Sequence, residues 1–270
     1  MNIYNIFKNE IGIATVTNEW IELMYREFCA EHGELLSDSD KLKAFSRHHK
    51  INLTQIKSEN AVKISGLYII DVHSMFSVFL ASFIRLPGAP TKAIKERANG
   101  EDVLTWILKG VYPQGYDEDI ECSYMICNYF RLIRNSLLHG NSRKLSPAEK
   151  MSLEKANEFF SKNSYFKGFR KALSAPNPVD QLVFDDQVLF SKAANNLAKR
   201  IYFDSTYDLR DHINQNKDIL KHKLAGFTDR ARIEKYLYYY LDQVYPVRDE
   251  KYNEIMQTII TEYMEQGVLA

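Results

Sequence analysis

The chain has 270 residues, which is enough for one large core or two modest domains. Its 45% hydrophobic and 26% charged residues are typical of a soluble globular protein. Because 35 basic and 35 acidic residues cancel, the global basic surface of many nucleic-acid-binding proteins is absent. Any nucleic-acid site must therefore be a local basic patch.

The cysteines and the amino terminus indicate a cytoplasmic protein. The three cysteines, Cys29, Cys122 and Cys127, lack the paired spacing of a metal site and fit a reducing compartment. Residues 1–8 contain no basic segment followed by an apolar run, so we expect no secretory signal. A glycine-rich phosphate loop and a complete H-x-E…P-C-x-x-C zinc signature are also missing. We therefore expect neither a metal nor a cofactor.

Residues 1–58 are expected to form an amino-terminal helical appendage. Within residues 19–31, apolar side chains recur at helical steps and predict a helix: Trp20, Leu23, Met24 and Phe28. The glycine and acidic residues of the 33–40 stretch predict a turn. The basic run 47–50 is interpreted as a second, solvated turn, since its two adjacent histidines point to different faces and make a poor metal pair.

A long apolar helix is predicted over residues 60–85, before the Pro-Gly-Ala-Pro stop at 87–90. Its length matches a membrane span. Asp71 and His73 near its middle would be costly in lipid, so a central core helix is the preferred interpretation and no membrane association is expected. Tyr68, Asp71 and His73 are its polar interior positions. They either face a site or are satisfied within a bundle.

Helices are also predicted over the rest of the chain, at residues 91–98, 101–111, 117–139, 147–161, 180–202, 207–224, 229–244 and 248–266. Ser146-Pro147-Ala148-Glu149 is a capping box with proline at the first helical position, and its short link to the preceding helix predicts an antiparallel hairpin. Residues 174–178 are the best linker candidate. Valine-rich alternating runs are missing, so the fold class is all-α, with segments at 1–58, 59–173 and 174–270.

The most informative stretch is Asn128 to Asn141, the end of the 117–139 helix. Apolar residues at steps of three and four make one stripe: Ile126, Phe130, Ile133 and Leu137. Polar residues four apart make a second stripe beside it: Arg131, Asn135 and His139. Gly140 favours the left-handed conformation that closes helices. A histidine in the last turn also stabilises the carbonyl end of a helix, so capping alone is one interpretation of His139.

Arg134-Asn135-Ser-Leu-Leu-His139 resembles the R-x(4–6)-H signature of HEPN-domain ribonucleases, including the polar residue that often follows the arginine. The resemblance covers about residues 60–162 and implies a helical bundle built from the 60–85, 101–111, 117–139 and 147–161 helices. Arg26 and His32 have a similar spacing, but Glu27 and Glu31 beside them would repel an RNA phosphate. We therefore discount that second match.

The resemblance implies a metal-independent endoribonuclease, a toxin or effector of bacterial defence or toxin–antitoxin systems that acts on RNA. An antitoxin or sensor protein as regulating partner fits this role. The expected catalytic residues are Arg134, Asn135 and His139, and the expected substrate-binding residues are Arg131, Arg143 and Lys144. Histidine titrates near neutral pH and can move the proton of the RNA 2′-hydroxyl, while the arginine fork matches phosphate oxygens. No acidic residue lies between Glu121 and Glu149.

A homodimer with a shared site is also expected. Residues five apart on a straight helix are rotated by about 140°, so Arg134 and His139 do not share a face. Cleavage asks for a base and an acid, whereas the motif supplies one histidine per chain. A two-fold axis beside this helix would bring two arginines and two histidines together.

Two other interpretations stay open. A non-catalytic HEPN-like helical protein could bind RNA or a protein partner as a regulatory module. A helical regulator could also carry the motif by chance, with His139 as a capping residue. Some HEPN toxins have a tyrosine shortly after the motif histidine that a partner nucleotidyltransferase modifies. Gly140, Asn141 and Ser142 follow His139 here, so that form of control is not expected.

Overall fold

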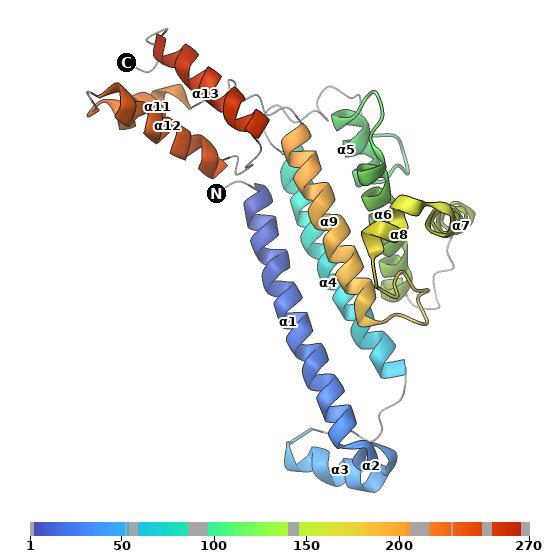
Figure 1. Ribbon diagram of the computed structural model, residues 1–270. Coiled ribbons are helices and arrows are strands. Elements are labelled where there is room, and N and C mark those ends of the chain that lie inside the picture. Colours follow the sequence, from blue (N-terminus) through green and yellow to red (C-terminus); the bar gives the residue numbers. More distant parts are fainter. Residues whose placement is uncertain are drawn as a thin grey trace. The chain divides into compact units, whose positions relative to one another are not determined.

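The computed structural model describes residues 3–51, 53, 59–85, 97–139, 146–205, 216–227, 229–244 and 250–265, and within them the fold is all-α, as predicted (Figure 1). The helices are α1 (Ile3–Glu31), α2 (Gly33–Ser37), α3 (Ser39–His48), α4 (Glu59–Ile84), α5 (Val103–Val111), α6 (Glu118–His139), α7 (Pro147–Lys162), α8 (Ser164–Arg170), α9 (Phe184–Asp204), α11 (Lys217–Leu224), α12 (Arg230–Val244) and α13 (Glu250–Glu265). Helices α4, α6 and α7 end within two residues of the predicted bounds.

The amino-terminal region differs most from the sequence prediction. Helix α1 begins at Ile3 rather than near residue 19. The turn predicted over 33–40 is wrong, because α2 and the start of α3 occupy it. Asp38 explains the break between these two helices, since its carboxylate accepts hydrogen bonds from the backbone N–H groups of Asp40 and Lys41 and caps α3. Acidic residues that suggest a turn can equally begin a helix.

Two predicted helices lie partly outside the described residues, and one helix was missed. Residues 91–96 and 207–215 lie outside the described residues, so the helix predicted over 91–98 and the first half of the one over 207–224 stay predictions. Helix α8 was not predicted. It begins at a cap formed by Asn163, whose side-chain oxygen accepts the N–H of Phe166 at 2.7 Å.

The chain divides into two compact units, each assembled from separate stretches. Unit 1 contains residues 1–6, 82–113 and 199–270, and unit 2 contains residues 7–81 and 114–198. Each unit therefore draws on all three of the segments expected from the sequence. The long helices α1, α4 and α9 each pass from one unit into the other.

In unit 1, apolar side chains of α11, α12 and α13 form one cluster, consisting of Leu220, Leu224, Leu237, Ile260 and Tyr263. Separately, Tyr4 at the start of α1 contacts the rings of Tyr202 and Phe203 near the end of α9. The hydroxyl of Tyr112 donates a 2.8 Å hydrogen bond to Asp204, which also pairs with Arg200 at 2.7 Å. These contacts join sequence-distant stretches of unit 1.

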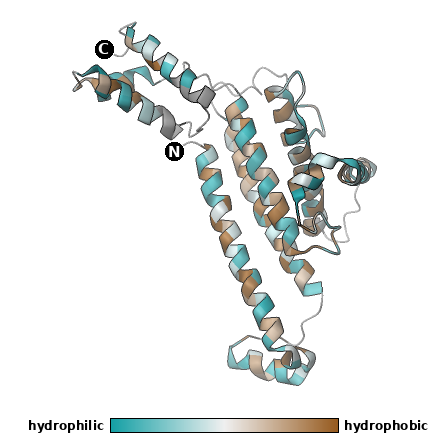
Figure 2. Cartoon of the chain, viewed as in Figure 1, coloured by the Kyte–Doolittle hydropathy of each residue, from teal (hydrophilic) through white to brown (hydrophobic). Residues whose placement is uncertain are grey.

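Aromatic contacts connect the helices of unit 2. Phe7 of α1 packs against Phe76 and Phe79 of α4, with ring centroids 5.9 and 5.3 Å apart. Phe130 of α6 stacks on Phe190 of α9 at 5.1 Å, and both side chains are fully buried. Figure 2 shows hydrophobic residues distributed along α4 and α9, which run side by side in Figure 1. Burial of these rings stabilises unit 2.

Helix α4 has the length and composition of a membrane span, and no membrane is part of this structure. Its apolar side includes the fully buried Ile69 and Val72 and the nearly buried Phe83. Its exposed side carries the polar residues Lys63, Asp71 and Ser74 and also the apolar residues Leu67 and Val78, which are 63% and 61% exposed. One face of the helix packs into the protein and the exposed face is mixed, so the core-helix interpretation stays a prediction.

The capping box at the start of α7 is confirmed. The hydroxyl of Ser146 accepts the N–H of Glu149 at 3.2 Å, and the Glu149 carboxylate accepts the N–H of Ser146 at 2.9 Å. The antiparallel hairpin is not observed, because α7 crosses α6 instead of running beside it (Figure 1). Contact with α6 comes from the end of α7, where Phe160 meets Tyr129 at 5.7 Å. The capping box fixes where α7 starts but does not fix its direction.

The predicted linker at 174–178 lies entirely within unit 2 and is anchored. The Asp186 carboxylate, in the first turn of α9, accepts hydrogen bonds from the backbone and side-chain N–H groups of Asn177 at 2.8 and 3.1 Å. The Tyr129 hydroxyl donates to the Asn177 carbonyl at 2.9 Å. Prolines in this stretch therefore belong to a fixed connection between α8 and α9 and not to a flexible link.

Candidate active site

The motif helix α6 packs against α4 within unit 2, and the two helices run in opposite directions. A Cβ placed on Gly66 of α4 would lie 3.1 Å from the Leu137 side chain of α6. His73, two turns further along α4, lies near Arg134 and Arg131, which come earlier in α6. Because Gly66 has no side chain, α4 can approach α6 closely at the level of Leu137. The polar residues of the motif helix therefore lie against the middle of α4.

Arg131 and Arg134 are held by neutral partners on their own helix. The Nε and Nη2 groups of Arg131 donate to the side-chain oxygen of Asn128 at 3.1 and 2.7 Å. The Nη1 group of Arg134 donates to the side-chain oxygen of Asn135 at 3.2 Å. Within the described part of the chain, neither guanidinium forms an ion pair with a carboxylate.

These arginines have unused binding capacity. Both are half-buried, and the Nε of Arg134 is buried without a hydrogen-bond partner among the described residues. Partial burial weakens the screening of their charge by water, and their asparagine partners carry no negative charge to offset it. An anion with several acceptor oxygens, such as a phosphate, would satisfy both.

His73 of α4 lies within electrostatic range of these arginines. Its Nδ1 lies 3.2 Å from the hydroxyl oxygen of Ser77, one helical turn later. Burial, together with the smaller effect of the positive charges of Arg134 and Arg131, lowers the pKa of His73 to about 4. The imidazole is therefore neutral at physiological pH, with one ring nitrogen as donor and the other as acceptor.

The structure brings together three of the six site residues expected from the sequence. Arg131, Arg134 and Asn135 form the cluster just described, in which Arg134 contacts Asn135. His139 is the last residue of α6, and its side chain lies outside the described residues. Arg143 and Lys144 also lie outside them. Because α6 stays helical to His139, the offset of about 140° between the positions of Arg134 and His139 persists in the structure.

The three polar positions of the 60–85 helix have separate environments. His73 lies beside the arginines, as described above. Asp71 is exposed, and Tyr68 is buried with its ring edge-on to Phe184 of α9 at 5.8 Å. Asp71 and Tyr68 therefore have no part in the cluster. From the sequence alone, all three residues could either face a site or be satisfied within a bundle, and these two cases could not be distinguished.

Arg26 and His32, the second arginine–histidine match, make contacts that are common on protein surfaces. The Arg26 guanidinium pairs with Glu22 one turn earlier at 2.8 Å. The His32 ring packs on Phe28 at 4.8 Å. An arginine that is already neutralised by a carboxylate is a poor phosphate ligand. The contrast with Arg134 supports discounting this match.

Two features of the site were missed from the sequence. Asn128, which accepts hydrogen bonds from Arg131, was named only as the start of the motif stretch. Its position three residues before Arg131 on the same helix could have predicted this contact. The pairing of His73 with α6 had no local signal, because it depends on how two helices pack.

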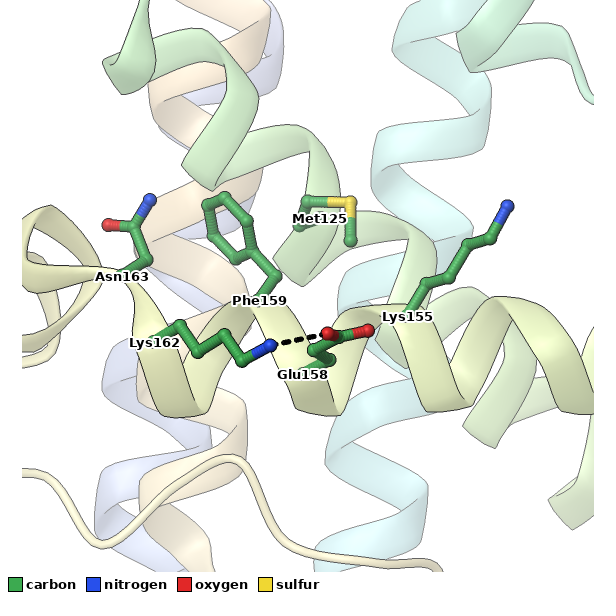
Figure 3. Close-up of a pocket in the computed structure, with 6 residues that line it drawn as sticks. All are labelled: Met125, Lys155, Glu158, Phe159, Lys162 and Asn163. Carbon is green, nitrogen blue, oxygen red and sulfur yellow. Dashed lines mark hydrogen bonds and ion pairs between the residues drawn. The ribbon is translucent and has the colours of Figure 1, made fainter.

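A separate shallow pocket lies between α6 and α7 (Figure 3). Met125 and Phe159 supply its apolar lining, and Lys162 pairs with Glu158 at 2.6 Å beside it. Met125 precedes Arg134 by nine residues, which places the two about 180° apart around α6. This pocket is therefore on the opposite face of α6 from the arginine cluster.

Known proteins offer no independent identification of the site. No family model, no curated protein and no solved structure matches this chain.

Proposed function

We propose that this protein is a metal-independent endoribonuclease of the HEPN type that acts in the cytoplasm as a toxin or effector of bacterial defence. The observation that carries the proposal is the pair Arg131 and Arg134, half-buried and without a carboxylate partner among the described residues, on the helix that ends at His139. The R-x(4–6)-H resemblance of the same residues gives this anion site its expected substrate, RNA.

Two copies of the motif supply the groups that the chemistry requires. A neutral His139 takes the proton of the RNA 2′-hydroxyl while that oxygen attacks the adjacent phosphorus. The bond from phosphorus to the 5′-oxygen breaks, and the 5′-oxygen leaves with a proton from a second, protonated imidazole. Arg134, with Asn135 and Arg131 beside it, stabilises the negative charge that develops on the phosphoryl oxygens. Arg143 and Lys144, which follow the motif, would bind neighbouring phosphates.

The products and the metal requirement test this scheme. Purified protein incubated with RNA in EDTA should release fragments that end in 2′,3′-cyclic phosphate and 5′-hydroxyl, identified by mass spectrometry. A substrate of the same sequence with every 2′-hydroxyl replaced by hydrogen is the matched control and should stay intact. Strict dependence on Mg²⁺, or cleavage of the deoxy substrate, would contradict attack by the 2′-hydroxyl.

The second imidazole motivates a further expectation, a homodimer with a shared site. A two-fold axis beside α6 would bring the motif of one chain to that of its partner and overcome the offset between Arg134 and His139. Dilution through the dissociation range should then lower the specific activity per chain, with light scattering as the measure of oligomeric state. Full activity where only monomer is detected would rule out the shared site and leave the ribonuclease proposal standing.

The alternative is a non-catalytic module that binds RNA or a protein partner. It is favoured by the two half-buried guanidinium groups, which have neutral partners and can bind a phosphate without a catalytic histidine. RNA binding that weakens with salt, without any cleavage in EDTA or Mg²⁺, would select this alternative. The possible regulators, an antitoxin or a sensor protein, are the same in both cases.

A further inference from the structure

Helix α1 has apolar side chains on two opposite faces, and only one of these faces is buried. Phe7, Ile11 and Asn18 line the buried face. The opposite face, called here the outer face of α1, consists of five large apolar residues that are 55–65% exposed: Ile13, Val16, Trp20, Leu23 and Met24. At about 100° per residue, Val16 and Trp20 lie within about 20° of the direction opposite to Asn18. The apolar spacing that predicted a helix here from the sequence thus belongs largely to the exposed side.

The area of the outer face of α1 is large for a monomer. Side chains of this size and exposure present roughly 500 Å² of accessible surface per chain, near the upper end of the largest apolar patch on a typical monomer. Two such faces in contact would bury roughly 1,000 Å², the lower limit expected for a specific protein–protein interface. A second copy of this chain therefore supplies enough area for a reversible dimer.

The spacing of the outer face is that of a helix that pairs with another helix. Its residues recur at steps of three, four and three, as in a coiled-coil seam: Ile13, Val16, Trp20 and Leu23. If two copies run antiparallel with residue 18 at the centre, Ile13 meets the partner's Leu23. Val16 then meets the partner's Trp20, so the largest side chain of the seam lies against its smallest. The seam is therefore complementary to its own antiparallel copy.

The polar residues at the two ends of the seam also favour the antiparallel direction. Asn9 and Glu27 continue the same spacing before Ile13 and after Leu23, and both are exposed. In an antiparallel pair, Asn9 meets the partner's Glu27, and an amide can donate a hydrogen bond to a carboxylate. In a parallel pair the two Glu27 carboxylates would face each other and repel.

The outer face of α1 is separate from the motif helix α6. Within unit 2, Phe190 of α9 stacks on Phe130 of α6, whereas Val188 and Lys192 of α9 line a groove beside α1. Val188 and Lys192 each lie two residues from Phe190, or about 160° from it around α9. Helices α1 and α6 are therefore on opposite sides of α9, and the outer face of α1 points away from the motif.

We propose that the outer face of α1 is a contact between two copies of this chain, which pair antiparallel through this seam. The contact differs from the two-fold axis proposed beside α6 and does not depend on the ribonuclease function. A chain that uses both contacts would form particles larger than a dimer, because each contact is a separate two-fold interface.

The same substitution at two sites of similar exposure tests the contact. Val16→Glu introduces a charge into the outer face of α1, and Val78→Glu introduces one on the exposed side of α4. In sedimentation velocity of the full chain, we expect Val16→Glu to halve the mass of the particle and Val78→Glu to leave it unchanged. Trp20→Ala should raise the Kd of self-association roughly 30-fold or more, as expected for a central aromatic residue of an interface. Circular dichroism verifies the fold of each variant.

A pair of opposite charges tests the direction of the helices. Ile13→Glu and Leu23→Lys, made one at a time, should each weaken self-association. On one chain together, they place the new carboxylate of each copy opposite the new ammonium group of its partner only if the helices are antiparallel. We therefore expect the double variant to associate more tightly than either single variant. In a parallel pair like charges would meet, and the double variant would associate least.

The outcomes decide the contact without any measurement of RNA cleavage. A parent protein that stays monomeric at its highest soluble concentration would overturn the proposal. So would a folded Val16→Glu or Trp20→Ala protein that associates like the parent, or a double variant that associates less than both single variants. The ribonuclease proposal is tested by cleavage in EDTA, so either proposal can fail while the other stands.

Discussion

Replacing His139 by alanine is expected to reduce RNA cleavage by about 10²-fold or more while leaving the helical content of the protein unchanged. General acid–base catalysis by a histidine typically contributes about 10²–10⁴-fold. His139 is the last residue of α6, so the substitution falls at the end of the helix and not within it. The measurement is kcat/KM on a defined RNA in EDTA, with circular dichroism to verify the fold.

His32→Ala is the matched control for this prediction. His32 belongs to the second arginine–histidine spacing of the chain and packs on Phe28 instead of completing a charged cluster. Its replacement should leave cleavage unchanged, which would show that the arginine–histidine spacing alone is not sufficient for catalysis. A folded His139→Ala protein that cleaves as fast as the parent would refute the ribonuclease assignment.

Replacing Arg134 by glutamine is expected to lower kcat by about 10²–10³-fold, the usual loss when one donor to a developing oxyanion is removed. Glutamine keeps much of the length and polarity of the side chain but not its charge or its planar fork. Arg134→Lys restores the charge without the fork and should recover only part of the rate. The loss should appear mainly in kcat, because the interaction strengthens as charge develops in the transition state.

Arg26→Gln provides the corresponding control. Arg26 is mostly exposed and paired with Glu22, so its removal should change stability by about 0.5 kcal/mol or less and leave cleavage unaffected. If Arg134→Gln and Arg26→Gln had equally small effects on cleavage and on RNA binding, the arginine cluster would have no role in either proposed function.

The position of His73 changes the argument for a shared dimer site. Two features of the sequence suggested the dimer: the rotation between Arg134 and His139 around the helix, and the need for a second imidazole. The charges of Arg134 and Arg131 act on an imidazole of the same chain, that of His73 in α4, but its low pKa leaves the second proton-transfer role open. The two-fold arrangement therefore remains the proposed source of that group, and dilution remains its test.

Local signals in the sequence were sufficient for the helices and for part of the site. The capping box at Ser146 and the apolar periodicity of α4 and α6 placed these elements correctly, because caps and periodicity depend on residues three or four positions apart. The same spacing placed Arg131 and Asn135 on one stripe of α6. Local signals failed at residues 33–40, where Asp38 begins a helix that the sequence suggested was a turn.

Contacts between distant residues were decided only by the tertiary structure. Nothing near His73 in the sequence indicates that the charge of Arg134 acts on it, since this depends on the packing of α4 against α6 near Gly66. The direction of α7 and the anchoring of Asn177 by Asp186 likewise follow from packing. The sequence thus determined which helices form and which side chains share a helix face. Packing determined which of those faces meet. Burial of apolar surface is not directional, so the partner of a helix face cannot be predicted from the spacing of residues along that helix.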